Sequence, residues 1–200
     1  MYYQYPLNLR FKLIALAPQI YVTDSSGQEI MFVRQKIFKL KEDVRIFSDS
    51  SKTTEVFRIR ADRIIDFSAK YHFFNSQTDA PLGAVKHKGF RSIWSAHWLL
   101  FDTSDQQSHH MTEDNPWAKV LDTLLGEIPV VGLFTGYVFH PSYTVYDSQT
   151  NEPVMRLTKE PAFFESKFTI QSLEGSLKPE EEQRILLSIL MAVQLERSRG

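Results

Sequence analysis

The sequence predicts a mainly β protein, a closed antiparallel barrel of about twelve strands around one buried hydrophobic C-terminal helix. Short runs of alternating polar and apolar residues end repeatedly at small polar clusters, which indicates a series of hairpins. The stretch Ile185–Leu195 is interrupted only by Ser188 and Gln194, so a helix there is apolar all round and must be enclosed. Hairpins bury one face by closing into a barrel, and the helix fills a lumen too wide for side chains alone.

Clusters centred on Asp or Asn set the spacing of the expected hairpins. They begin at Asp24, Asp49, Asn75, Asp102 and Asp147. These residues favour turns because their side chains bond nearby backbone groups. The strand before the turn also repeats: Phe67–Asn75 matches Trp94–Asp102 at an offset of 27, and Phe164–Ile170 is a looser third copy. Self-similarity at a fixed period indicates a repeated supersecondary unit.

A longer gap before the last cluster predicts an inserted segment at about residues 111–136. Asn115-Pro116 suits a helix start, Trp117–Leu125 a short inserted helix, and Gly126 its C-terminal cap. The apolar run Ile128–Phe139 is too short to span a bilayer and is expected to be a buried strand with a kinked beginning.

The last expected helix has charged flanks that suit a soluble protein. Pro179 fits the first helical position, Glu180–Glu182 lie at the positive end of the helix dipole, and Arg197 and Arg199 lie at the negative end. A membrane span needs roughly 20 apolar residues, more than this run offers. We therefore expect no transmembrane segment.

Composition bounds the class of protein. A chain of 200 residues is expected to form a single domain over residues 1–200. The net charge of -1 argues against nucleic acid as a partner. The absence of cysteine excludes disulfides, thiol catalysis and zinc-thiolate sites. The N-terminus does not fit a signal peptide, so we expect a cytoplasmic protein, with peripheral membrane association as an alternative.

Several stretches, in their order and spacing, resemble the LURP-one-related family. They are Tyr21–Gly27, Phe67–Tyr71, Gly136–Tyr143, Lys159–Glu165 and the closing apolar helix that ends in Glu196-Arg197. That family shares the tubby C-terminal-like fold with Tubby proteins and phospholipid scramblases, so the resemblance implies a closed barrel around a central C-terminal helix. It implies no shared catalytic residues. Tubby relatives bind phosphoinositide headgroups through basic residues and scramblases are linked to lipid movement, so by analogy the resemblance implies a lipid connection.

No catalytic constellation is present in the sequence. The nucleophile elbow, the phosphate-binding loop, the His-Glu-x-x-His zinc motif and the EF-hand loop are all absent. The adjacent His109 and His110 lie in a polar stretch and are interpreted as solvated loop residues rather than metal ligands. We therefore expect a protein that is not an enzyme, with no catalytic residues, no metal and no cofactor.

Paired basic residues form the candidate binding site. They are Arg34, Lys36, Arg58, Arg60, Lys86 and Lys88. Members of a pair are two residues apart and share a face of their strand, at similar distances from successive turns. Stacked hairpins would align them as a cationic stripe, which suits phosphorylated lipid headgroups. The alternative is a solvated face whose charge is neutralised by Glu29, Glu55, Asp62 and Asp79.

Three functions remain open from the sequence. The first is a non-enzymatic binding module for phosphoinositides or other anionic phospholipids at a membrane surface. The second is a scramblase-like lipid-handling protein, which the sequence favours less because it lacks an exposed apolar anchor and a cysteine for acylation. The third is a soluble barrel that holds a small ligand in its mouth or binds a protein partner.

Overall fold

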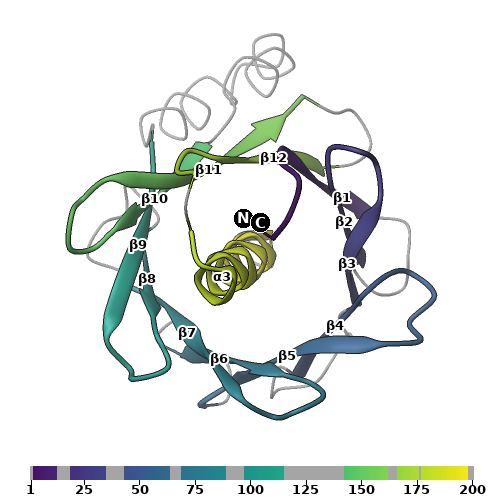
Figure 1. Cartoon of the computed structure of the whole chain (residues 1–200), viewed down its shortest axis with the longest axis horizontal. Helices are drawn as coiled ribbons and strands as arrows, with labels where there is room; N and C mark the ends of the chain where they lie inside the picture. The colour runs from purple at the N-terminus through teal and green to yellow at the C-terminus, as the bar shows by residue number, and fades with distance from the viewer. Residues whose placement is uncertain are drawn as a thin grey trace, which may run out of the picture.

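The computed structural model describes residues 2–12, 19–34, 43–63, 69–88, 97–114, 142–161, 166–175 and 177–197. In these ranges the chain forms a closed antiparallel barrel in which each strand pairs with its neighbours in sequence and β1 pairs with β12 (Figure 1). The strands are β1 Leu7–Lys12, β2 Gln19–Thr23, β3 Glu29–Arg34, β4 Asp43–Phe47, β5 Glu55–Ala61, β6 Lys70–Asn75, β7 Pro81–His87, β8 His97–Phe101, β9 Gln107–Glu113, β10 Ser142–Asp147, β11 Pro153–Glu160 and β12 Ser166–Ser172. The predicted twelve-stranded barrel is confirmed.

Side chains alternate between the lumen and the exterior along each strand. On β1, Leu7, Leu9 and Phe11 are buried and the residues between them are exposed. Leu9 lies opposite Val22 of β2 and Phe168 of β12, which are also buried. Because successive residues of a strand point to opposite faces, apolar residues at every second position line the lumen. Their burial is the main force that holds the wall in place.

The helix α3 (Pro179–Arg197) lies inside the ring of strands (Figure 1). Residues Ile185–Val193 are all buried, which confirms the prediction of an enclosed helix. The helix approaches β7 most closely, at Gly83. A Cβ atom there would lie 2.5 Å from Cδ of Arg184 and would also clash with the carbonyl oxygen of Phe101. No helix among the described residues is long and apolar enough to cross a membrane.

Each of the predicted turn clusters closes a hairpin. The side-chain oxygen of Asp24 accepts hydrogen bonds from the backbone N–H groups of Ser26 and Gln28 and from the Ser26 hydroxyl. In each of the four remaining clusters, the side-chain oxygen of the first residue likewise accepts a hydrogen bond from the backbone N–H two residues later. These first residues are Asp49, Asn75, Asp102 and Asp147. The turns join β2 to β3, β4 to β5, β6 to β7, β8 to β9 and β10 to β11.

The structure differs from two expectations. The interpretation of His109 and His110 as solvated loop residues is wrong, because both lie in β9, which pairs with β8 and β10. Polar residues occupy both faces of β9, so its alternation does not stand out in the sequence. The sequence predicts the inserted segment from about residue 111, but residues 111–113 belong to β9. Its expected helix and apolar strand lie outside the described residues.

Candidate functional site: a basic row on the barrel exterior

The pairing register places basic residues in one row across five neighbouring strands. Lys12 of β1 lies opposite Gln19 of β2, which lies opposite Arg34 of β3. Arg34 lies opposite Arg45 of β4, and Arg45 lies opposite Arg58 of β5. We call Lys12, Arg34, Arg45 and Arg58 the basic row. Cβ atoms of directly opposed residues are about 4.5–5.5 Å apart, so the three arginines form a continuous cationic strip.

The basic row lies on the outside of the barrel. Val33, Ile46 and Ile59, which neighbour the arginines along their strands, are buried in the lumen. Alternation therefore directs the arginine side chains outward. The side chain of Arg45 is 47% exposed and that of Arg58 is 28% exposed, so an external ligand can reach both.

A groove of about 440 Å³ adjoins the basic row, over β12, β1 and β2. Arg10 lies opposite both Tyr21 and Lys167, and all three line the groove. Lys12 also lines it, with its Nζ atom 4.8 Å from the centroid of the Tyr21 ring. Lys12 therefore belongs to both the groove and the basic row. Two carboxylates, those of Glu29 and Glu160, complete the charged lining.

Glu55 balances part of the positive charge. Its Oε1 atom accepts a hydrogen bond from Arg58 Nη2 at 2.8 Å, and its Oε2 atom lies 3.6 Å from Arg45 Nη1. Burial of the Glu55 carboxyl favours its neutral form, but hydrogen bonds from Ser76 and Arg58 and the nearby positive charges outweigh burial and lower its pKa. Arg34, by contrast, forms no ion pair with another described residue. Glu55 therefore neutralises part of the charge of Arg45 and Arg58.

A protein-family model, that of the LURP-one-related family, matches residues 29–131, just over half of the chain. The chain belongs to the LURP-one-related family. No curated protein and no solved structure matched it. The matched range contains Arg34, Arg45 and Arg58, whereas the groove residues of β1, β2 and β12 lie outside it.

The predicted stripe exists only in part in this LURP-one-related barrel. Arg34 and Arg58 are brought together through Arg45, but the row ends at β6, where Phe74 lies opposite Arg58. Lys86 lies opposite Lys70 instead. Strands of a closed barrel are staggered, so equal distances from successive turns do not give equal positions in the hydrogen-bonded rows.

The remaining predicted residues take different positions. Arg60 points outward beside the row, 3.5 Å from Asp79 and 4.9 Å from the centroid of the Phe74 ring. Lys88 follows β7 and is exposed, and Lys36 lies outside the described residues. Glu55 and Asp79 are two of the four carboxylates that the solvated-face alternative names, and they pair with Arg58 and Arg60 as it expects.

Arg45 and the groove residues Arg10 and Lys167 of this LURP-one-related chain are absent from the predicted site. The predicted basic pairs lie on strands that follow a turn, whereas Arg45 lies on the strand before the turn at Asp49. Arg45 and Arg58 face each other across this hairpin, but a bulge between Ile46 and Phe47 sets that register, so the spacing from the turn does not by itself reveal the pair. Arg10 and Lys167 meet only through barrel closure, for which the sequence carries no local signal.

Proposed function

We propose that this LURP-one-related protein is a non-enzymatic module that binds phosphorylated headgroups of anionic membrane lipids through the basic row and the groove. The direct opposition of Arg34, Arg45 and Arg58 carries the proposal. Like charges opposite each other on neighbouring strands destabilise a sheet, so the arrangement does not serve the fold. A bound anion would remove the repulsion.

The chemistry of the row suits phosphate. An arginine guanidinium donates two parallel hydrogen bonds to one phosphate group, and a lysine adds a compact charge. The groove has the size of a small-ligand site and would receive one headgroup, while the row would face neighbouring acidic lipids. Because the groove and the row share Lys12, a single approach to the membrane engages both.

Vesicle co-sedimentation tests the proposal. Neutral phosphatidylcholine vesicles are compared with phosphatidylserine and phosphoinositide vesicles of equal surface charge, at low and at near-physiological salt. A basic residue near an anionic surface contributes about 1 kcal/mol, so Arg34→Glu should weaken phosphoinositide binding at least about fivefold. The matched control is Lys178→Glu, an equal charge change at an exposed residue next to α3.

Two outcomes would count against the proposal. The first is phosphoinositide binding that Arg34→Glu leaves unchanged. The second is an equal loss from Arg34→Glu and Lys178→Glu, because that result would mean attraction by overall charge alone. Retention of binding at near-physiological salt would separate a specific headgroup site from a diffuse one.

The groove also favours a second candidate, a soluble phosphorylated ligand. Its concave lining places Arg10, Lys12 and Lys167 around one volume, which a free inositol phosphate would also fit. Calorimetry with a soluble inositol phosphate, beside the vesicle assay, distinguishes the two sources of phosphate. The scramblase-like alternative needs an extended apolar exterior, and the exposed large apolar residues in the described ranges are Tyr2 and Leu173.

A further inference from the structure

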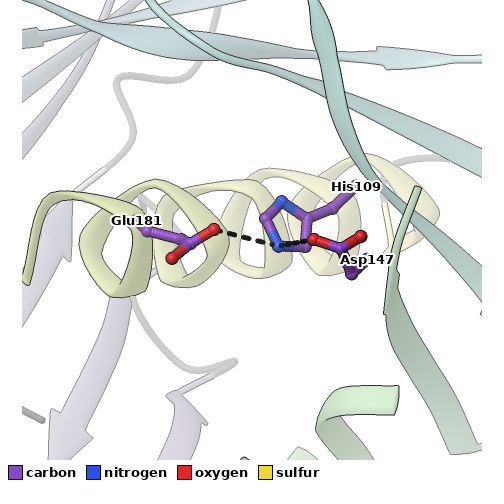
Figure 2. A group of neighbouring side chains, drawn as sticks. All are labelled: His109, Asp147 and Glu181. Carbon is purple, nitrogen blue, oxygen red and sulfur yellow. Dashed lines mark ion pairs between the residues drawn. The ribbon is translucent and has the colours of Figure 1, made fainter. Parts of the chain in front are cut away.

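A polar cluster lies inside the barrel beside the first turn of α3. His109 of β9, Asp147 at the end of β10 and Glu181 of α3 point toward one another (Figure 2). Asp147 lies directly opposite His109 in the pairing of the two strands. We call these three residues the lumen cluster. It joins the wall of the barrel to the helix that fills it.

The distances in the lumen cluster are longer than, but close to, those between ligands of one metal ion. His109 Nε2 lies 3.4 Å from Glu181 Oε1 and 3.9 Å from Asp147 Oδ2. The three potential ligand atoms all lie within 4.8 Å of one another. Tetrahedral ligands at about 2.0–2.1 Å from a zinc ion are about 3.3 Å apart, so a small inward movement of the carboxylates would complete the coordination.

The imidazole of His109 points independently to a missing ligand. Its side chain is 1% exposed, and its Nε2 atom is buried without a hydrogen-bond partner. Buried polar atoms nearly always have a partner, so this one calls for an explanation. Its other ring nitrogen, Nδ1, lies 3.0 Å from the hydroxyl of Ser108. A metal-bound histidine usually hydrogen-bonds through its second ring nitrogen in the same way.

Each carboxylate has an oxygen available for the cluster. Asp147 Oδ1 accepts turn hydrogen bonds from the backbone N–H groups of Gln149 and Thr150, whereas Oδ2 faces His109. The side chains of Asp147 and Glu181 are 29% and 26% exposed, so the cluster is open to solvent on one side. Two carboxylates and a neutral imidazole carry a charge that a divalent cation balances. Arg184 lies nearby but forms no ion pair with Glu181 within 4.0 Å.

We propose that His109, Asp147 and Glu181 bind one zinc ion, which fastens α3 to β9 and β10. The imidazole disfavours calcium and magnesium, which prefer oxygen ligands alone. Zinc accepts imidazole and carboxylate together, and three protein ligands leave its fourth position to water. Because one ligand comes from the helix and two come from the wall, the ion would oppose withdrawal of the helix.

Zinc titration of the full chain tests the proposal in the absence of lipid. Calorimetry on metal-stripped protein should give one zinc ion per chain. The melting temperature should rise by about 5 °C or more at zinc concentrations of 100 times Kd, because the ion binds only the folded form. Glu181→Gln and His109→Gln should each weaken zinc binding at least about tenfold, the loss seen even for residues that only support a metal ligand.

His110→Gln is the matched control, because His110 is adjacent in sequence but points outward and stacks on Tyr146. It should leave zinc binding unchanged. Absence of zinc binding by the folded chain would overturn the proposal. A loss of zinc binding in His110→Gln but not in Glu181→Gln would also overturn the proposal. That result would place the ion at the stacked pair of His97 and His110 outside the barrel. If His109→Gln fails to fold, the result with Glu181→Gln decides the test. The Glu181 side chain is partly exposed, and glutamine has nearly the same shape as glutamate, so this variant should fold.

Discussion

Arg34 of β3 lies directly opposite Arg45 of β4 on the outer face of the barrel. Only the neighbouring Arg58 and Arg45 share the carboxylate of Glu55, so the repulsion at Arg34 is not offset by a described ion pair. Like charges directly opposite each other on neighbouring strands cost stability. The proposed anion-binding role of the basic row would account for this arrangement.

Replacing Arg34 with threonine should therefore stabilise the isolated protein while weakening its binding to anionic vesicles. Removal of like charges opposite each other, together with the high strand propensity of threonine, should raise the free energy of unfolding by about 0.2–1 kcal/mol. Urea denaturation at low salt measures the gain, which should shrink in 1 M salt as the charges are screened. Lys178→Thr serves as the control. A variant that gains binding or loses stability would contradict the expectation.

Replacing Leu190 with aspartate should unfold the protein. Leu190 is 2% exposed in the middle of α3, so the new carboxylate would be buried without a partner. An uncompensated buried charge costs several kcal/mol, roughly half the stability of a typical domain. Circular dichroism should show a lost or strongly lowered melting transition. Leu190→Met conserves volume and should cost less than about 1.5 kcal/mol. A folded aspartate variant with unchanged melting would refute the enclosed helix.

Replacing Gly83 with alanine should destabilise the barrel more than the same change at Gly27. Both glycines have positive φ, at +125° and +85°. A Cβ at Gly83 would meet Arg184 and the Phe101 carbonyl, whereas one at Gly27 would have no atom within 4 Å. Gly27→Ala should cost about 1 kcal/mol of backbone strain, and Gly83→Ala should cost an additional 1–3 kcal/mol or so from overpacking. If thermal denaturation shows equal losses of stability for the two variants, α3 does not pack closely against β7 at Gly83.

Acid should weaken the hairpin between β2 and β3 through Asp24. Hydrogen bonds from the Ser26 hydroxyl and from the backbone N–H groups of Ser26 and Gln28 lower the pKa of its carboxyl below the ordinary value of 3.8, although burial opposes them. Because the folded pKa is the lower one, the stabilisation is fully present above about pH 4 and is lost as the pH falls through the folded pKa.

Asp24→Asn should therefore lower stability at pH 7 and make the fall in stability below pH 4 shallower. Urea titrations between pH 2 and pH 7 measure both effects. Glu152→Gln, a change at an exposed residue of another hairpin, is the control. If the free energy of unfolding of Asp24→Asn falls below pH 4 as steeply as that of the unmodified protein, the charge of Asp24 makes no contribution to stability.

The barrel could be predicted because its signals are local. The alternation of Leu7, Leu9 and Phe11, the turn at Asp24 and the unbroken apolar surface around Leu190 each depend on neighbouring residues alone. Whatever the register, the apolar face of the strands and the apolar helix must both be buried, which predicts that the strands close around the helix. The same alternation predicts that basic residues on β3 and β5 face outward, but it does not predict which of them lie opposite each other.

The lumen cluster and the basic row depend on register, which the sequence leaves open. Arg58 meets Arg45 because a bulge between Ile46 and Phe47 sets the pairing of β4 with β5. His109 looks like a loop residue because Ser108 and His110 on either side are also polar. Its burial beside Glu181 requires contact between strands and a helix that are far apart in the chain, a contact no local pattern reports.

The position of α3 after all the described strands has a consequence for synthesis. A ribosome adds about 5–20 residues per second from the N-terminus, so the strands of the wall emerge before the segment that fills them. Until β12 and α3 appear, β1 presents an unpaired edge and the lumen residues face water, which is a state prone to association between chains. The helix that fills the lumen is thus also the segment whose late arrival ends the exposure of the lumen residues in nascent chains.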